Sequence, residues 1–168
     1  MCFFLTDAMT HEHEHEHEEL HSEIRYHAIK QHFIGSNIST HNGEGKSAHY
    51  KNYILGNNPS SWKRKVYSFN EVTYPNFYDG IDLIYIGQRG QLSYNFRIQP
   101  ETNIGLIAFN FDGAESVRIK DGNLIIGHRF GTISQSKPKA WEIDENGNKK
   151  QKIPVEYVIH NDIVSFHF

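Results

Sequence analysis

Four histidines alternate with glutamates in the run HEHEHEHEE, residues 11–19, and both residue types can take part in binding a metal. Neutral imidazoles bind Zn²⁺, Ni²⁺ or Cu²⁺, and the glutamates would raise the affinity by adding negative charge. In a strand the four histidines project from one face. In a helix they and the next histidine fall at the i, i+4 spacing that suits chelation. The candidate metal ligands are His11, His13, His15, His17 and His21.

A selective metal site needs ligands that are fixed by surrounding hydrogen bonds, and this repeat has low complexity and no apolar anchor. We therefore interpret residues 11–21 as a connector, partly disordered or helical, in which Zn²⁺, Ni²⁺ or Cu²⁺ would bind only adventitiously. No physiological cofactor is expected. A pH sensor is an alternative, since imidazoles with a pKa of about 6.5 would become charged together near pH 6.

The remaining polar residues form no catalytic pattern. The sequence has no Gly-x-Ser-x-Gly motif, and its single cysteine is Cys2. Asp79 and Asp82 supply too few oxygens for Ca²⁺ and are better explained as residues that bind the backbone of a tight turn. We therefore expect no catalytic residues and no enzyme activity.

Aromatic residues supply a different candidate site between residues 50 and 78, where they stand beside several asparagines. Flat rings stack on sugar faces while amides bind hydroxyl groups, so such a mixture can form a glycan-binding surface. The alternative is that alternate aromatic residues fill the core of a sheet. The candidate ligand-binding residues are Tyr53, Trp62, Tyr74, Phe77 and Tyr78.

The elements that must position these residues are strands. Apolar residues alternate with polar ones over residues 92–98, and residues 83–86 are apolar on both faces, as in a central strand. Asp121-Gly122 and Asn146-Gly147 separate apolar runs and suit hairpin turns. No stretch after residue 35 has helical periodicity over ten residues. We predict an all-β fold, an antiparallel β-sandwich or curled sheet with hairpin connections.

The charge of the chain is unevenly distributed. Residues 1–23 hold seven of the twenty acidic residues and no Lys or Arg, so the remainder, with thirteen acidic and 17 basic residues, carries about +4. The basic residues are too dispersed for nucleic-acid binding. We predict a partial first strand and an acidic His-rich connector over residues 1–23, and one β-domain over residues 24–168. No apolar run is long enough to span a membrane, and no signal peptide is recognisable.

Five blocks of sequence carry a resemblance to a known family. They are HFIGSN (32–37), NYILGNNPSSW (52–62), VTYPNFYDGIDLIYIG (72–87), GQLSYNFRIQPETN (90–103) and FDGAESVRIKDGNLII (111–126). Together they resemble the domain of unknown function that precedes SBBP-type β-propeller repeats in large bacterial surface proteins, which are commonly exported by type IX secretion. The resemblance implies a non-catalytic, adhesin-like structural or interaction module at the cell surface or outside the cell. It supplies no catalytic residues to transfer.

The resemblance also sets expectations for partners. The adjacent β-propeller repeats or other domains of the parent protein are the expected partners, with a surface glycan or protein as a further one. The chain resembles a fragment of a larger domain, so unpaired sheet edges would favour oligomerisation or poor solubility. Asn58 replaces a residue that is usually acidic in the family, which weakens the expectation of a cap there. A metal-binding protein and a glycan-binding module are the alternative functions.

Overall fold

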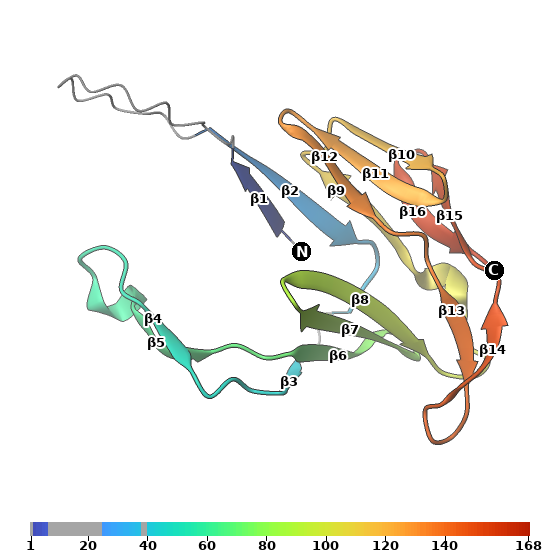
Figure 1. The fold of residues 1–168 in the computed structure, drawn as a ribbon, viewed down its shortest axis with the longest axis horizontal. Coiled ribbons are helices and arrows are strands. Elements are labelled where there is room, and N and C mark those ends of the chain that lie inside the picture. The colour runs from blue at the N-terminus through green and yellow to red at the C-terminus, as the bar shows by residue number, and fades with distance from the viewer. Residues whose placement is uncertain (1, 7–24, 38–39) are drawn as a thin grey trace. The chain divides into compact units, whose positions relative to one another are not determined.

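The chain is built from antiparallel β-strands and two single turns of 3₁₀ helix over the residues that the computed structural model describes, which are 2–6, 25–37 and 40–168 (Figure 1). The predicted all-β class with antiparallel sheets and hairpins is confirmed. The chain forms two compact units, one joining Met1–Ile34 to Ile107–Phe168 and the other consisting of Gly35–Leu106. The predicted boundary after residue 23 stays a prediction, because residues 7–24 lie outside the described part.

The first unit contains three antiparallel sheets. The largest has the strand order β1-β2-β9-β16-β15, the second has the order β10-β11-β12, and the third is the hairpin β13-β14. The strands are β1 (Cys2–Thr6), β2 (Tyr26–Phe33), β9 (Ala108–Asp112), β10 (Ser116–Lys120), β11 (Asn123–His128), β12 (Gly131–Gln135), β13 (Ala140–Ile143), β14 (Lys149–Ile153), β15 (Glu156–His160) and β16 (Ile163–His167). β2 and β9 are therefore neighbours although the whole second unit separates them in the sequence.

Alternating burial explains why β2 and β9 form this sheet. Along β2, Ile29, Gln31 and Phe33 are buried, while the side chains between them are exposed. Phe109 of β9 is fully buried, and the centre of its ring lies 5.6 Å from that of Phe33 and 5.7 Å from that of Phe111. Because burying one such side chain contributes about 1.5–3 kcal/mol, these rings anchor the sheet.

A glycine and a histidine connect β2 to the turn after β9. His27 Nε2 donates a hydrogen bond to the backbone oxygen of Gly113 at 2.6 Å. Gly113 has a φ of 83°, and a Cβ atom at this position would overlap the backbone oxygen of Ala28. The ring of the buried His128 lies 5.9 Å from that of His27, and its Nδ1 accepts a hydrogen bond from the amide of Phe130. The close approach of the turn to β2 therefore requires a residue without a side chain.

The two hairpin turns predicted in this unit are confirmed. Asp121-Gly122 joins β10 to β11, and both residues have positive φ, as a type I′ turn requires. Asn146-Gly147 lies between β13 and β14, where the carboxylate of Asp144 accepts hydrogen bonds from the amides of Asn146 and Asn148 at 2.9 and 2.8 Å. The hydrogen bonds from Asn148 hold the pKa of the Asp144 carboxyl below its ordinary value.

The second unit contains a four-stranded sheet of order β3-β6-β7-β8 and a separate two-stranded hairpin, β4-β5. Its elements are β3 (Asn42–Glu44), β4 (Tyr50–Tyr53), η1 (Pro59–Ser61), β5 (Lys63–Tyr67), β6 (Glu71–Tyr78), β7 (Ile81–Gln88), β8 (Gln91–Ile98) and η2 (Ile104–Leu106). All pairs are antiparallel, and β7 lies between β6 and β8 as an inner strand of its sheet.

β7 has the burial predicted for a central strand. The successive residues Leu83 and Ile84 are exposed by only 1% and 6%, so both faces of the strand are covered there. The carboxylate of Asp82 accepts a hydrogen bond from the amide of Asn76 at 2.8 Å. Asn76 has a φ of 51° and lies where the β6-β7 register shifts. Asp82 therefore binds backbone, as predicted, although its partner lies six residues earlier rather than two residues later.

Replacing Gly113 with alanine should destabilise the first unit by at least about 2 kcal/mol more than replacing Gly147 with alanine. The two glycines have matched φ values of 83° and 81°, but only Gly113 has an atom where the new Cβ would lie. Denaturant unfolding can be followed through Trp141, which belongs to the first unit, in a Trp62→Phe background. Equal losses for the two variants would contradict the packing role of Gly113.

Candidate functional site

The five aromatic residues predicted as a ligand-binding surface lie on two parts of the second unit. Tyr74, Phe77 and Tyr78 belong to β6, in the four-stranded sheet. Tyr53 is the last residue of β4, and Trp62 follows η1 directly and precedes β5. The structure therefore brings the first three together on one strand and places the other two at the end of the β4-β5 hairpin.

The three residues on β6 take part in the aromatic packing of their sheet. The ring of Phe77 lies 6.2 Å from that of Tyr74 and 5.3 Å from that of Tyr78, centre to centre. Tyr78 is only 3% exposed and cannot stack on a ligand without rearrangement. The row continues through Tyr85 of β7 and Tyr94 of β8, which the sequence analysis did not select. This packing favours the alternative in which alternate aromatic residues fill a core.

Burial changes the acidity of one phenol in this row. Burial and, to a lesser extent, the nearby phenol of Tyr74 together raise the pKa of Tyr85 to about 12, since burial disfavours the charged form and two phenolates would repel each other. The side chain of Tyr85 is half-buried. This tyrosine is therefore a packing residue that keeps its proton throughout the neutral range.

Residues 46–69, which include the β4-β5 hairpin, form a second candidate surface that we call the basic arm. β4 and β5 pair with each other and with no other strand in the described part of the chain (Figure 1). The ring of Tyr50 lies 5.8 Å from that of Tyr67, its partner in the register, and Lys46 Nζ lies 3.7 Å from the centre of the Tyr67 ring. These contacts hold the two strands together from one side of the hairpin.

The loop at the end of the basic arm is closed by its own hydrogen bonds. The side-chain oxygen of Asn58 accepts hydrogen bonds from the amide and the hydroxyl of Ser60, at 3.1 and 2.8 Å, and so caps η1. Trp62 Nε1 donates to the backbone oxygen of Gly56 at 3.2 Å. The expectation that Asn58 would be a poor cap is wrong, because an amide oxygen caps as effectively as a carboxylate.

Exposed apolar side chains are concentrated in the basic arm. It holds six of the fourteen large hydrophobic residues that are exposed in the described part of the chain: Tyr50, Tyr53, Ile54, Leu55, Val66 and Phe69. Leu55 is exposed by 73% and Ile54 by 54%. Clusters of this kind on a soluble surface mark interaction sites.

The charged residues of the basic arm all have the same sign. They are Lys46, Lys51, Lys63, Arg64 and Lys65, and residues 45–70 contain no Asp or Glu. Tyr53 and Trp62 were predicted from the sequence, whereas the basic residues were judged too dispersed for nucleic-acid binding and the apolar pair Ile54-Leu55 was not selected. The signal was the absence of acidic residues from a stretch rich in Tyr and Lys. The geometry and charge together suit an anionic partner that also has apolar groups.

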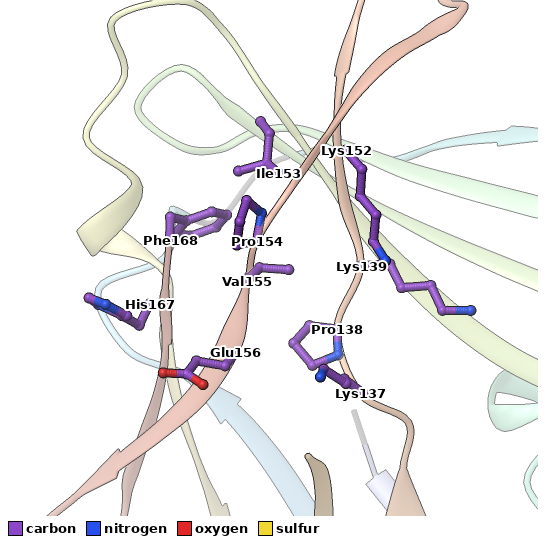
Figure 2. Close-up of a pocket in the computed structure, with 10 residues that line it drawn as sticks. All are labelled: Lys137, Pro138, Lys139, Lys152, Ile153, Pro154, Val155, Glu156, His167 and Phe168. Atoms are coloured by element: carbon purple, nitrogen blue, oxygen red, sulfur yellow. The ribbon is translucent and has the colours of Figure 1, made fainter. Parts of the chain in front are cut away.

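A groove of about 630 Å³ in the first unit is a second basic surface (Figure 2). Residues 137–139 form one wall, and residues 153–156 lie across from them (Figure 2). Its lining residues are Lys137, Pro138, Lys139, Lys152, Ile153, Pro154, Val155, Glu156, His167 and Phe168. The lining contains three lysines and one carboxylate, so the groove has the same sign of charge as the basic arm. It lacks a comparable cluster of exposed apolar side chains, since the lining residues that are exposed and apolar are Pro154 and Phe168.

The predicted metal ligands His11, His13, His15, His17 and His21 lie outside the described residues. Within the described residues, no group of three or more His, Cys, Asp or Glu side chains is placed to hold a metal ion. The same part of the chain has no helix of the length and apolarity needed to cross a membrane. The metal-binding alternative therefore stays a prediction.

The sheets and the basic arm define an all-β module with one exposed, cationic hairpin. The chain belongs to the family described as Domain of unknown function (DUF7948), whose model matches residues 1–168. The comparisons found no match among curated proteins and none among solved structures.

Replacing Tyr85 with phenylalanine should remove one phenol that ionises near pH 12. A tyrosine pKa raised on folding stabilises the folded state fully below about pH 10, and that contribution is lost as the pH rises from about 10 to about 12. Tyrosinate absorbance recorded after a rapid pH jump, before the chain unfolds, measures the ionisation of this phenol. A Tyr50→Phe control should retain the ionisation near pH 12. A wild-type chain whose phenols have all ionised well below pH 12 would contradict the burial of Tyr85.

Proposed function

We propose that the chain is a non-catalytic interaction module of a secreted bacterial cell-surface protein and that it binds through the basic arm. The observation that carries this proposal is that the basic arm combines six exposed apolar side chains with five cations and no acidic residue. An isolated two-stranded hairpin is only marginally stable in water. Apolar side chains that stay exposed on both of its strands do not stabilise its fold, and they are better explained as the contact surface for a binding partner.

The resemblance described above supports the context of the module. The sequence blocks resemble those of domains that precede SBBP-type β-propeller repeats in proteins exported by type IX secretion. We infer that the chain lies on the N-terminal side of such repeats outside the cell, and that it needs no cofactor. The gene should therefore continue into propeller repeats and a sorting domain. A gene encoding an intracellular enzyme after this module would contradict the inference.

Binding to cells tests the role of the basic arm. The purified, fluorescently labelled chain should bind to intact cells of the bacterium that encodes it. Reversing three charges of the arm, in Lys63→Glu/Arg64→Glu/Lys65→Glu, should lower the bound fraction about tenfold or more at low ionic strength, since complementary charges steer and hold such contacts.

The matched control reverses the same number of charges in the groove, in Lys137→Glu/Lys139→Glu/Lys152→Glu. This variant should bind cells as the wild type does. A loss of binding in the groove variant, with the arm variant unaffected, would place the binding surface in the groove and overturn the proposal. Circular dichroism of both variants checks that they are folded.

A further inference from the structure

The residues of the basic arm are ordered along its length. The loop between the strands, residues 54–62, contains no charged residue, and its first two residues are the exposed Ile54 and Leu55. Tyr53 ends β4 just before the loop, and Trp62 is the last residue of the loop, next to β5. On the β4 side the order from the loop into the strand is therefore aliphatic, then aromatic, while residues 56–61, between Leu55 and Trp62, are uncharged and mostly polar.

The cations follow directly behind the aromatic residues. Lys63 is the register partner of Tyr53, and Lys51 is that of Val66. Arg64 and Lys65 complete the group, and the centre of the Arg64 guanidinium lies 5.7 Å from the Trp62 ring. None of the basic residues in this hairpin has an acidic residue near it in sequence, because residues 45–70 contain none.

Part of the backbone at the end of the arm is bonded within the arm itself. Trp62 N donates to the backbone oxygen of Pro59 at 3.2 Å, and Ser61 N donates to that of Asn58 at 3.1 Å. The amide of Lys65, which has a φ of 54°, donates to the side-chain oxygen of Asn52 at 2.9 Å. These bonds fix the second half of the loop, residues 58–62, and its junction with β5, which lowers the cost of ordering this part on binding.

We infer that the basic arm docks on an anionic lipid surface, with Ile54 and Leu55 entering the headgroup region and the cations bound to lipid phosphates. This inference rests on the proposed function and names the class of its partner. Aliphatic side chains enter deepest, Trp and Tyr favour the interface, and Lys and Arg bind anionic headgroups. Along β4 the arm has its residues in this order, and along β5 Trp62 is followed by Lys63, Arg64 and Lys65. An acidic protein surface would complement the charge but would not require an uncharged loop with exposed aliphatic residues ahead of the cations.

Trp62 can report the docking directly. The sequence has two tryptophans, so Trp141→Phe leaves Trp62 as the only one. With vesicles of phosphatidylglycerol and phosphatidylcholine in equal parts, the emission of Trp62 should shift to shorter wavelength and the chain should sediment with the vesicles. Vesicles of phosphatidylcholine alone should give neither result, and added salt should weaken binding because it screens the cations.

Two variants in this background separate the apolar and charged contributions. Leu55→Asp should lower vesicle binding about tenfold or more and abolish the shift, since it places a carboxylate among lipid phosphates. Leu92→Asp alters a leucine of β8 in the same unit that is 57% exposed, and should leave binding unchanged. Reversal of Lys63, Arg64 and Lys65 to glutamate should also abolish binding.

Failure of the inference differs from failure of the proposed function. Binding to cells that depends on the arm, without binding to anionic vesicles, would keep the interaction module and overturn the lipid surface as its partner. Equal binding to neutral and anionic vesicles, or an equal loss in Leu92→Asp, would also overturn the inference. Binding to cells that survives the arm variant would overturn the proposed function itself.

Discussion

Antiparallel pairing of β7 with β6 on one side and β8 on the other determines where the aromatic side chains of the second unit lie. Tyr85 is the direct register partner of Tyr94, and Tyr74 pairs with Leu83, so rings from three strands fall on one face. Side chains on one face of a sheet follow the pairing, because neighbouring residues of a strand point in opposite directions. A shift by one residue would move this whole row to the other face.

The β4-β5 hairpin lacks this constraint. Its two strands contain the same residue types as β6 to β8, namely tyrosine and β-branched residues, but no third strand among the described residues extends its sheet. Tyr50 and Tyr53 are 49% and 47% exposed, whereas Tyr78 is 3% exposed. The difference lies in the number of neighbouring strands and not in the side chains themselves. This is why one group of aromatic residues packs while the other remains accessible.

Much of the fold followed from local patterns in the sequence. Alternation of apolar residues over 92–98 and turn residues such as Asp121-Gly122 act over a few residues, and they predicted β8 and the β10-β11 hairpin correctly. The candidate surface was harder to predict, because Tyr53 and Tyr78 look alike in sequence and differ only in tertiary contacts. The cap at Asn58 was missed because a family preference for acid was given more weight than the chemistry of an amide oxygen. The division into two units depends on pairing between β2 and β9, which no local pattern reveals.

The pairing of β2 with β9 has a consequence for how this protein can vary. The amide of Ile34 donates to the backbone oxygen of Ala108 at 2.8 Å, so the chain leaves the first unit and returns to it at the same place. Relative to the five-stranded sheet, residues 35–106 form one long insertion whose two ends are held together by the sheet. The entropic cost of closing such a loop rises only slowly with its length. Residues can therefore be added to this insertion or removed from it, or the whole insertion can be exchanged, which changes the β4-β5 hairpin while the five-stranded sheet keeps its register.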